Sequence, residues 1–263
     1  MKIVSFDPFR TLHLPGVSYL KPEHWLARSE LLLAADWVLF PGAWQLDVLE
    51  YVFRCRVFPS PATLRLGFDK VVMTRAMQAA FPALLPETLI LPNTPAGQEE
   101  TLDRLELPFV VKAPRDSMGR GVKLVRTRSE FLDWCCGQPL IYAQRYLPVQ
   151  RDLRVVWVGD SVVGAYWRIN NDGFLNNVAQ GGRIDFDDIP AAALDAVAMI
   201  ARRFGIDHAG FDIAWLDGEA QFFEFNVLFG NQALNARGLR IEPFIHDWLL
   251  RHHEDPAPLP RSA

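Results

Sequence analysis

Two kinds of apolar pattern alternate along this chain: short continuous runs and residues spaced at helical intervals. Residues 37–40 form a short continuous apolar run, which is typical of a strand buried in a parallel sheet. Residues 191–204 instead carry apolar side chains at helical intervals, and Gly205 follows where a helix C-terminus often has glycine. Strands and helices therefore alternate, and the pattern predicts an α/β or α+β protein.

Turn and capping residues between these segments predict three units and a tail. The first unit, residues 1–66, is a small α/β layer with expected strands at 2–6, 37–40 and 55–58 and expected helices at 22–33 and 44–53. The second unit, residues 67–138, has expected helices at 70–80, behind an Asp69 N-cap, and from Ser129 to Gly137; its expected strands are 88–91, 107–112 and 122–126, with a loop at 92–97.

The third unit, residues 139–255, begins with an expected strand at 140–144. Its other expected elements are a hairpin of 153–158 and 162–168, the helix 191–204, strands around 210–215 and 221–226, and a last helix at 242–252. Residues 169–185 are polar and lack periodicity, which is often a property of a functional lid. The Pro-rich tail 256–263 is expected to be flexible.

The composition narrows the class of protein. Half of the 263 residues are hydrophobic and the net charge is −4, so a large buried core is expected and a nucleic-acid partner is not. No apolar run reaches the ~18 residues of a transmembrane helix, and no secretion signal opens the chain, so we expect a cytoplasmic protein without a membrane partner. Three cysteines cannot all pair, and we expect reduced thiols.

Polar residues interrupt two apolar strands near the C-terminus. Asp212 lies in Gly-Phe-Asp-Ile-Ala-Trp, and Glu224 and Asn226 lie in Gln-Phe-Phe-Glu-Phe-Asn. Strand positions i and i+2 share a face, so Glu224 and Asn226 point the same way. An oxygen-only set of this kind suits a hard cation such as Mg²⁺. The alternative is two strand residues satisfied by hydrogen bonds and one surface aspartate.

A shared cation site places a condition on the strand register. A two-residue turn at 217–218 sets Asp212 opposite Phe223, and Glu224 then faces away from Asp212. A three-residue loop sets Asp212 opposite Glu224 instead. Asp-Gly usually forms the two-residue turn, so we predict either an odd-length loop or a compensating bulge.

A glycine-containing loop follows the strand that ends in Lys112. Glycines at 119 and 121 allow backbone N–H groups to approach phosphate oxygens, and Lys112 supplies a positive charge nearby. Neither GxxxxGK[ST] nor GxGxxG is present. Taken alone, the loop fits an ordinary hairpin connection as well as a phosphate site.

The order of these features resembles the ATP-grasp superfamily and, within it, the RimK-like carboxylate–amine ligases. The resemblance covers about residues 60–252 and is most specific over 107–122, 209–215 and 223–226. It implies an ATP-grasp fold in which two α+β lobes, residues 67–138 and 139–255, clasp ATP. A short Rossmann-like N-terminal α/β domain, residues 1–66, precedes them.

The resemblance also implies roles for individual residues. Those that would contact ATP are Lys70 and Lys112 with the loop residues Ser117, Met118, Gly119 and Gly121 at the phosphates, Gln144, Arg145, Tyr146 and Leu147 at the adenine, and Asp152 at the ribose. Asp212, Glu224 and Asn226 would hold one or two Mg²⁺, with Mn²⁺ as an alternative ion. The catalytic arginines would be Arg168 and Arg154, and the substrate side would comprise Asn176, Gly181, Gly182 and Asn231.

Structural alternatives stand beside several of these roles. Asp152 could be an ion-pair partner of Arg154, Gln144 could pair with backbone at a strand end, and Lys70 could be an exposed first-turn residue. Arg154 and Arg168 could be surface charges of one hairpin. His208, which we place in a loop before the Asp212 strand, is expected to have no catalytic role.

The implied reaction joins a carboxylate to an amine through an acyl phosphate, with ADP and phosphate released. The amine or carboxylate would belong to an amino acid, a peptide or a protein side chain. The alternatives are a kinase on the same fold and a nucleotide-binding module without turnover; the intact Asp212, Glu224 and Asn226 set argues against the module. The oligomeric state stays open, with a homodimer as one option.

The sequence departs from the family pattern in two places. Gln144 stands where many relatives have an acidic residue, and the basic Arg145 follows it. After Asn226, Val227, Leu228 and Phe229 precede Gly230, where many relatives have a small residue, Ser and Pro. The second change predicts a bulkier acceptor side and leaves the substrate open.

Overall fold

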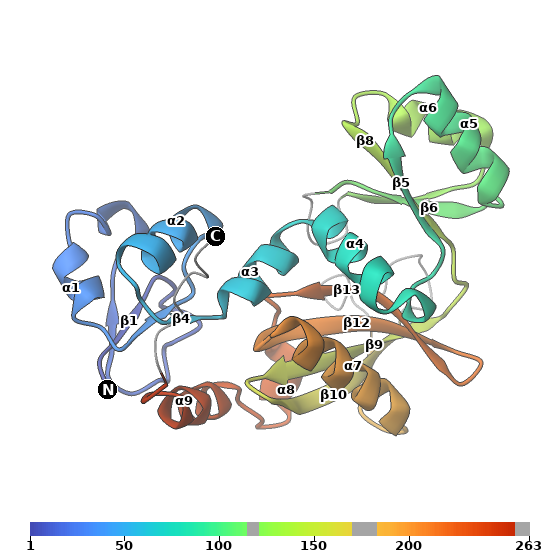
Figure 1. Cartoon of the computed structure of the whole chain (residues 1–263). Helices are drawn as coiled ribbons and strands as arrows, with labels where there is room; N and C mark the ends of the chain where they lie inside the picture. Colours follow the sequence, from blue (N-terminus) through green and yellow to red (C-terminus); the bar gives the residue numbers. More distant parts are fainter. Residues whose placement is uncertain (115–120, 170–182, 256–263) are drawn as a thin grey trace.

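The computed structural model describes residues 1–114, 121–169 and 183–255 of the chain. The described residues form three sheets, with strand orders β2-β1-β3-β4, β5-β8-β6-β7 and β11-β10-β9-β12-β13. The three units follow the chain in that order, and α3 (Pro61–Phe68) lies between the first unit and the rest (Figure 1).

The N-terminal sheet is parallel throughout its described pairings. Its strands are β1 (Ile3–Ser5), β2 (Val17–Tyr19), β3 (Trp37–Leu39) and β4 (Val57–Phe58), and its helical segments are a 3-10 helix (Pro22–His24), α1 (Ser29–Leu33), α2 (Ala43–Asp47) and a π-helix (Val48–Val52). The prediction of a single helix at 22–33 is wrong. The chain turns between the 3-10 helix and α1, and this turn buries Trp25 in the core. The edge strand β2 has no buried residue and was not expected.

The second sheet is antiparallel and is covered by two helices. Its strands are β5 (Thr88–Pro92), β6 (Phe109–Lys112), β7 (Val122–Val125) and β8 (Leu140–Arg145), and its helices are α5 (Pro95–Arg104) and α6 (Arg128–Cys135). The loop expected at 92–97 is wrong in its second half, since Thr94 caps α5 and Pro95 begins it. Thr127, and not Ser129, caps α6. The sequence placed β8 in the third unit, but the strand pairs with β5 and β6 and so belongs to the second sheet.

The third sheet carries the predicted metal residues. Its strands are β9 (Arg151–Val158), β10 (Ser161–Ile169), β11 (Arg183–Asp185), β12 (His208–Leu216) and β13 (Glu219–Asn226), and the helices of this part of the chain are α7 (Ala191–Phe204), α8 (Gln232–Ala236) and α9 (Glu242–Arg251). α7 ends at Gly205 in the left-handed conformation, as expected. α8 was not expected.

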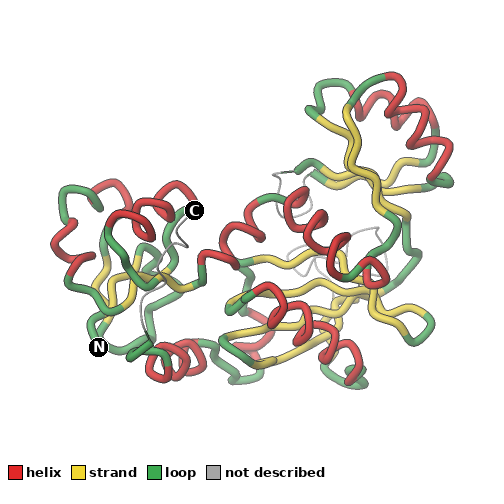
Figure 2. Tube along the Cα trace, viewed as in Figure 1, coloured by secondary structure: helices red, strands yellow, loops and turns green. Residues whose placement is uncertain are grey.

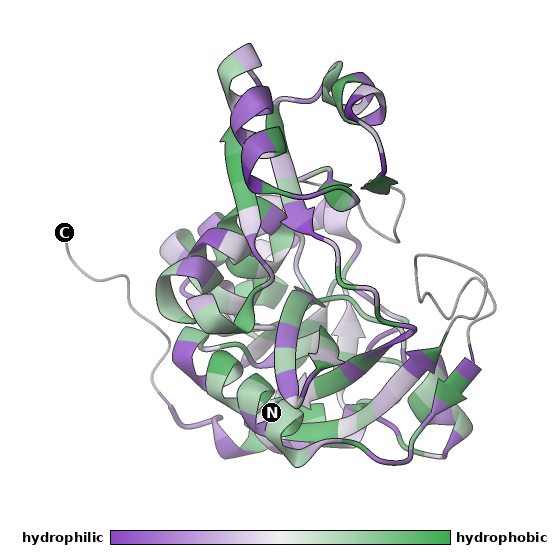
Figure 3. Cartoon of the chain, turned by 90° about the vertical axis from the view of Figure 1, so that its right-hand side faces the viewer, coloured by the Kyte–Doolittle hydropathy of each residue, from purple (hydrophilic) through white to green (hydrophobic). Residues whose placement is uncertain are grey.

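A helix from the second unit completes the core of the third sheet. Met73 and Met77 of α4 (Lys70–Ala80) are buried with Phe225 of β13 and Val197 of α7 in one hydrophobic cluster. A 3-10 helix (Pro82–Leu84) follows α4 and leads away to the second sheet. The second sheet projects away from the other two, with hydrophobic residues concentrated along its strands (Figures 2 and 3). Lys70 is thereby held over the third sheet.

The β12–β13 hairpin combines a two-residue turn with a bulge. Leu216 pairs with Glu219 around Asp217 and Gly218, both of which have positive φ. Ile213 then pairs with Phe222, but Asp212 pairs with Glu224, so Phe223 is an extra residue. The prediction of a compensating bulge is confirmed.

Cys55, Cys135 and Cys136 are free cysteines, as expected. Among the described residues, no helix has both the length and the apolar character needed to cross a membrane.

Candidate active site

Arg154 and Asp212 form a buried ion pair in the centre of the third sheet. They are cross-strand partners on β9 and β12. Arg154 donates from Nε to Oδ1 of Asp212 at 2.5 Å and from Nη2 to Oδ2 at 3.1 Å. Both side chains are about nine-tenths buried, so the alternative of a surface aspartate and a surface arginine is wrong.

A second buried ion pair joins the first. Arg168 on β10 lies 3.0 Å from Asp212 through Nη2 and donates from Nε to Asp152 at 2.6 Å. Asp152 pairs across the strands with Arg168, and not with Arg154 as the structural alternative supposed. Burial would raise the pKa of Asp212, but the two guanidinium groups outweigh it and lower that pKa. Burial raises the pKa of Asp152 to about 6, against the attraction of Arg168.

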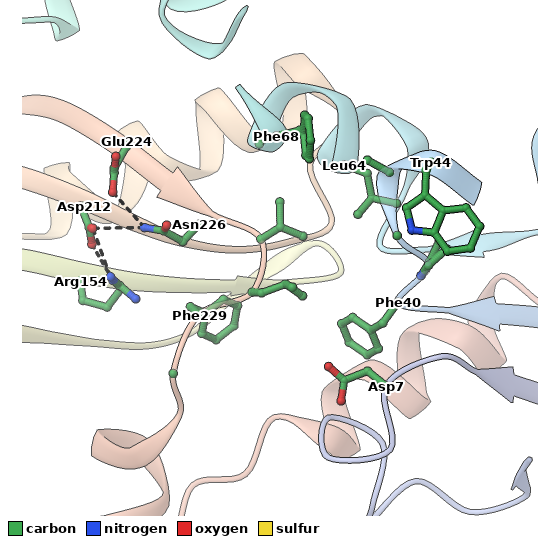
Figure 4. Close-up of a pocket in the computed structure, with 17 residues that line it drawn as sticks. Asp7, Phe40, Trp44, Leu64, Phe68, Arg154, Asp212, Glu224, Asn226 and Phe229 are labelled. Atoms are coloured by element: carbon green, nitrogen blue, oxygen red, sulfur yellow. Dashed lines mark hydrogen bonds and ion pairs between the residues drawn. The ribbon is translucent and has the colours of Figure 1, made fainter. Parts of the chain in front are cut away.

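Glu224 and Asn226 lie on the same face of the sheet as Asp212. The Asn226 amide nitrogen is 3.4 Å from Oδ2 of Asp212 and 3.3 Å from Oε1 of Glu224, so the three side chains converge (Figure 4). Lys70 Nζ lies 3.5 Å from the other Glu224 oxygen. The lysine at the start of α4 therefore reaches the predicted metal residues.

This trio fits a hard cation by its chemistry. It offers two carboxylates and one amide, and half a turn of the Asn226 amide would present oxygen to the same point. Within the described ranges, no three His, Cys, Asp or Glu side chains gather in a way that could hold a metal ion. The protein oxygens that could contact a cation at this place are therefore those of the two carboxylates and, once the amide is turned, that of Asn226.

Lys112 ends β6 and is buried, with only 7% of its surface exposed. Its Nζ lies 5.6 Å from the ring centre of Tyr142 and 5.8 Å from that of Phe223, the bulge residue. Burial lowers the pKa of Lys112 to about 8, and the nearby Glu224 offsets part of this effect. The Ala113 N–H donates to the Gly121 carbonyl at 2.7 Å and closes the base of the glycine loop.

The remaining predicted loop residues lie outside the described residues. They are Ser117, Met118 and Gly119 at the phosphates and Asn176, Gly181 and Gly182 on the substrate side. The described substrate-side residue, Asn231, is the N-cap residue of α8, and its buried side-chain oxygen has no hydrogen-bond partner among the described residues.

The segment proposed to contact adenine ends β8. Gln144 is buried and donates to the Thr88 hydroxyl at 2.8 Å. The Arg145 N–H donates to the Glu87 carbonyl at 2.8 Å, while its side chain is exposed. Tyr146 is half-buried and Leu147 is buried. The Gln144 amide thus bonds a side chain, and not backbone as the structural alternative supposed.

A pocket of about 770 Å³ extends from the trio to the N-terminal domain. Arg154, Asp212, Glu224 and Asn226 line one end (Figure 4). The segment 227–230 lines the middle, and the other end is lined by residues that sequence reasoning missed: Asp7, Phe40, Pro41, Gly42, Ala43, Trp44, Leu64, Gly67 and Phe68. These residues lie far from the trio in sequence, so no local sequence pattern linked them to it.

His208 lies beneath this pocket, on β12 and not in the loop where we expected it. Its Nδ1 is 2.9 Å from the Val227 carbonyl oxygen, and its ring stacks on Phe229 at 4.8 Å. Burial lowers the pKa of His208 to about 3, so the ring is neutral and supports the pocket wall.

Comparison with known proteins decides the family. The model of the RimK-like ATP-grasp domain matches residues 72–248, from α4 to α9. The chain belongs to the RimK-like ATP-grasp family.

Two curated proteins are similar to part of this chain. Tetrahydromethanopterin:alpha-L-glutamate ligase of Methanocaldococcus jannaschii is 33% identical over 90 residues, which is 32% of this chain and 31% of that protein. Beta-citrylglutamate synthase B of Danio rerio is 28% identical over 155 residues, which is 56% of this chain and 38% of that protein. The matches thus span about a third of the length of these relatives.

Solved structures show the ATP-grasp fold over nearly the whole chain. The RimK domain protein from Sphaerobacter thermophilus superposes with a TM-score of 0.70 at 16% identity, covering 94% of this chain and 99% of that one. D-alanine–D-alanine ligase from Bacillus anthracis, complexed with ATP, gives 0.71 at 14% identity, covering 97% and 99%. At these identities the likeness concerns the fold.

Proposed function

We propose that this chain is an ATP-dependent carboxylate–amine ligase that forms an amide bond through an acyl phosphate. The observation that carries the proposal is the convergence of Asp212, Glu224 and Asn226 on the sheet face that also holds Arg154 and Arg168. Two cationic side chains, Lys70 and Lys112, approach this face from the other lobe. Such a site suits a triphosphate and a divalent cation.

We assign the nucleotide to the space between the second and third sheets. Lys70, Lys112 and the loop that Gly121 closes would bind the phosphates, and the segment from Gln144 to Leu147 would face the adenine. Asp152 would accept hydrogen bonds from the ribose hydroxyls while it also accepts the hydrogen bond from Arg168. The membership of the chain in the RimK-like ATP-grasp family, and the fold that it shares with an ATP-complexed ligase, support this assignment.

Asp212, Glu224 and Asn226 would hold Mg²⁺, which would neutralise charge on the β- and γ-phosphates. Arg154 and Arg168 would spread charge on the transferring phosphoryl group. Both guanidinium groups are held by buried carboxylates, so little reorganisation is needed when the charge develops.

The reaction then needs no nucleophilic side chain. A carboxylate oxygen of the substrate attacks the γ-phosphorus, and the bond to the ADP oxygen breaks. The amine nitrogen next attacks the acyl carbon, phosphate leaves with the bonding electrons, and the nitrogen loses a proton. The lobes serve to position the reactants and to keep water from the acyl phosphate.

Hydroxylamine tests this proposal without knowledge of the natural amine. The chain is incubated with Mg-ATP, a panel of carboxylates and hydroxylamine, and hydroxamate and ADP are measured together. A ligase forms both in equal amounts with at least one carboxylate. ADP formed with a stable phosphorylated product indicates a kinase, and ATP binding without ADP indicates a module without turnover; either result overturns the proposal.

A further inference from the structure

The pocket beside the catalytic residues has an apolar far end. Trp44 and Phe68 line it from the N-terminal domain and α3, and Leu228 lines it from the segment after β13. These three side chains are 63%, 59% and 58% exposed, which is unusual for large apolar residues gathered in one concavity. An apolar pocket with a few polar groups at one end is the usual form of a small-molecule site.

The Trp44 ring is held in place by its surroundings. It meets the buried Trp25 ring edge-on, with 5.5 Å between the ring centres. A Cβ at Gly42 would lie 2.7 Å from the Trp44 indole nitrogen, so glycine leaves the space that the ring uses. A positioned aromatic ring binds an apolar group without a large loss of side-chain freedom.

The charges around the pocket disfavour an acidic substituent at this end. Among the described lining residues, Arg154 is the cation, and its guanidinium is bound to Asp212. The charged group at the far end is Asp7 (Figure 4). Arg10, which pairs with Asp7 at 3.4 Å, is not a lining residue and donates to the Phe229 carbonyl. An anionic substituent would therefore meet a carboxylate and, within the described part of the lining, no uncommitted cation.

From these observations we propose that the carboxylate substrate of this chain carries a large uncharged substituent, aromatic or branched aliphatic, held by Trp44, Phe68 and Leu228. The inference rests on the proposed ligase function, because it places the reacting carboxylate at the Arg154 end of the pocket. The pocket volume of about 770 Å³ accommodates a substituent of this size together with the reacting group.

Two carboxylates separate this inference from its opposite: 3-phenylpropionate, with an aromatic substituent, and glutarate, with an acidic one. With Mg-ATP and hydroxylamine, the ratio kcat/KM for hydroxamate formation is expected to favour 3-phenylpropionate at least tenfold. Trp44→Ala and Phe68→Ala should each reduce this preference about tenfold and leave the KM for ATP unchanged. Tyr19→Ala, which removes an exposed aromatic residue of the same domain outside the pocket, should leave it unchanged.

A gain-of-function variant and a binding measurement complete the test. Leu228→Arg introduces a cation at an exposed pocket position and should shift the preference toward glutarate. Equilibrium binding of both carboxylates with Mg²⁺ and a non-hydrolysable ATP analogue reports the preference without turnover. If no hydroxamate forms but 3-phenylpropionate binds through Trp44, the ligase proposal fails and the substrate class stands. Equal or stronger binding of glutarate, no binding of either, or a preference unaffected by Trp44→Ala overturns the inference.

Discussion

Asp212 lies directly opposite Glu224 in the β12–β13 hairpin, although the two-residue turn that joins these strands would set it opposite Phe223. The bulge at Phe223 makes the difference. Phe222 and Phe225 on either side of the bulge stay buried in the core, while Glu224 and Asn226 face the site. One extra residue thus reconciles a tight turn with a shared carboxylate pair.

Glu224→Gln is expected to abolish most Mg²⁺-dependent ADP release while the fold stays intact. The substitution removes one of two carboxylate charges of the trio and the partner of Lys70. We expect a decrease of about 10²–10³-fold in kcat, the range found when a group that stabilises developing charge is lost. Glu219→Gln, an exposed residue of the same strand, is the matched control. Near-normal turnover of the first variant, with unchanged metal dependence, would refute the metal assignment.

Asp212→Asn is expected to destabilise the fold as well as to stop the reaction. Asp212 is the shared partner of the buried Arg154 and Arg168, and an asparagine leaves two buried guanidinium groups short of a counter-charge. Loss of one partner in a buried pair costs about 3–5 kcal/mol. Urea unfolding of this variant and of Glu224→Gln separates the two roles, since Glu224 is more exposed. Equal stability of the two variants would contradict a structural role for the Asp212 network.

ATP affinity is expected to fall as the pH rises above about 8. Burial lowers the pKa of Lys112 to about 8, so the lysine is charged below that pH and loses its charge above it. The charged form binds phosphate oxygens, so bound phosphate raises the pKa of Lys112. Between the pKa of the free protein and this higher pKa, affinity can fall up to tenfold per pH unit. Calorimetry of ATP binding between pH 7 and 9.5 measures the effect. Lys112→Arg, which keeps its charge, should show a flat profile; an equally steep profile in this variant would exclude Lys112 as the titrating group.

Gly67→Ala is expected to destabilise the contact between α3 and the end of β13. A Cβ at Gly67 would lie 2.3 Å from a Val227 methyl group and 2.9 Å from the Phe225 ring, so the backbone or both side chains must move. Overpacking of this kind costs about 1–3 kcal/mol in the free energy of unfolding. Gly230→Ala, where the new Cβ meets no atom of the described residues within 4 Å, is the control for thermal unfolding. If both variants unfold at the same temperature, the close approach of α3 to β13 does not limit stability.

The local elements follow from sequence because their determinants are local. Asp69 caps α4, Gly205 ends α7, and the turn at 159–160 joins β9 to β10, all as the residue types predict. Side chains alternate along a strand, so a cation shared by Asp212 and Glu224 required either an odd-length loop or a bulge, and the structure has the bulge. The same local logic failed at α5, which Thr94 caps within an expected loop.

What surrounds the site was decided by tertiary structure. Nothing in the spacing of Asp152, Arg154 and Arg168 says that both arginines share the carboxylate of Asp212, because that contact depends on the pairing of β9 with β10 and with β12. The sequence alone identified the side chains that we propose bind phosphate and cation, since this proposal rests on side-chain chemistry. The packing of α3 and the N-terminal domain against the segment after β13 decided that Trp44 and Phe68 line the same pocket as Asp212, because long-range burial of apolar surface, and not sequence proximity, brings such residues together.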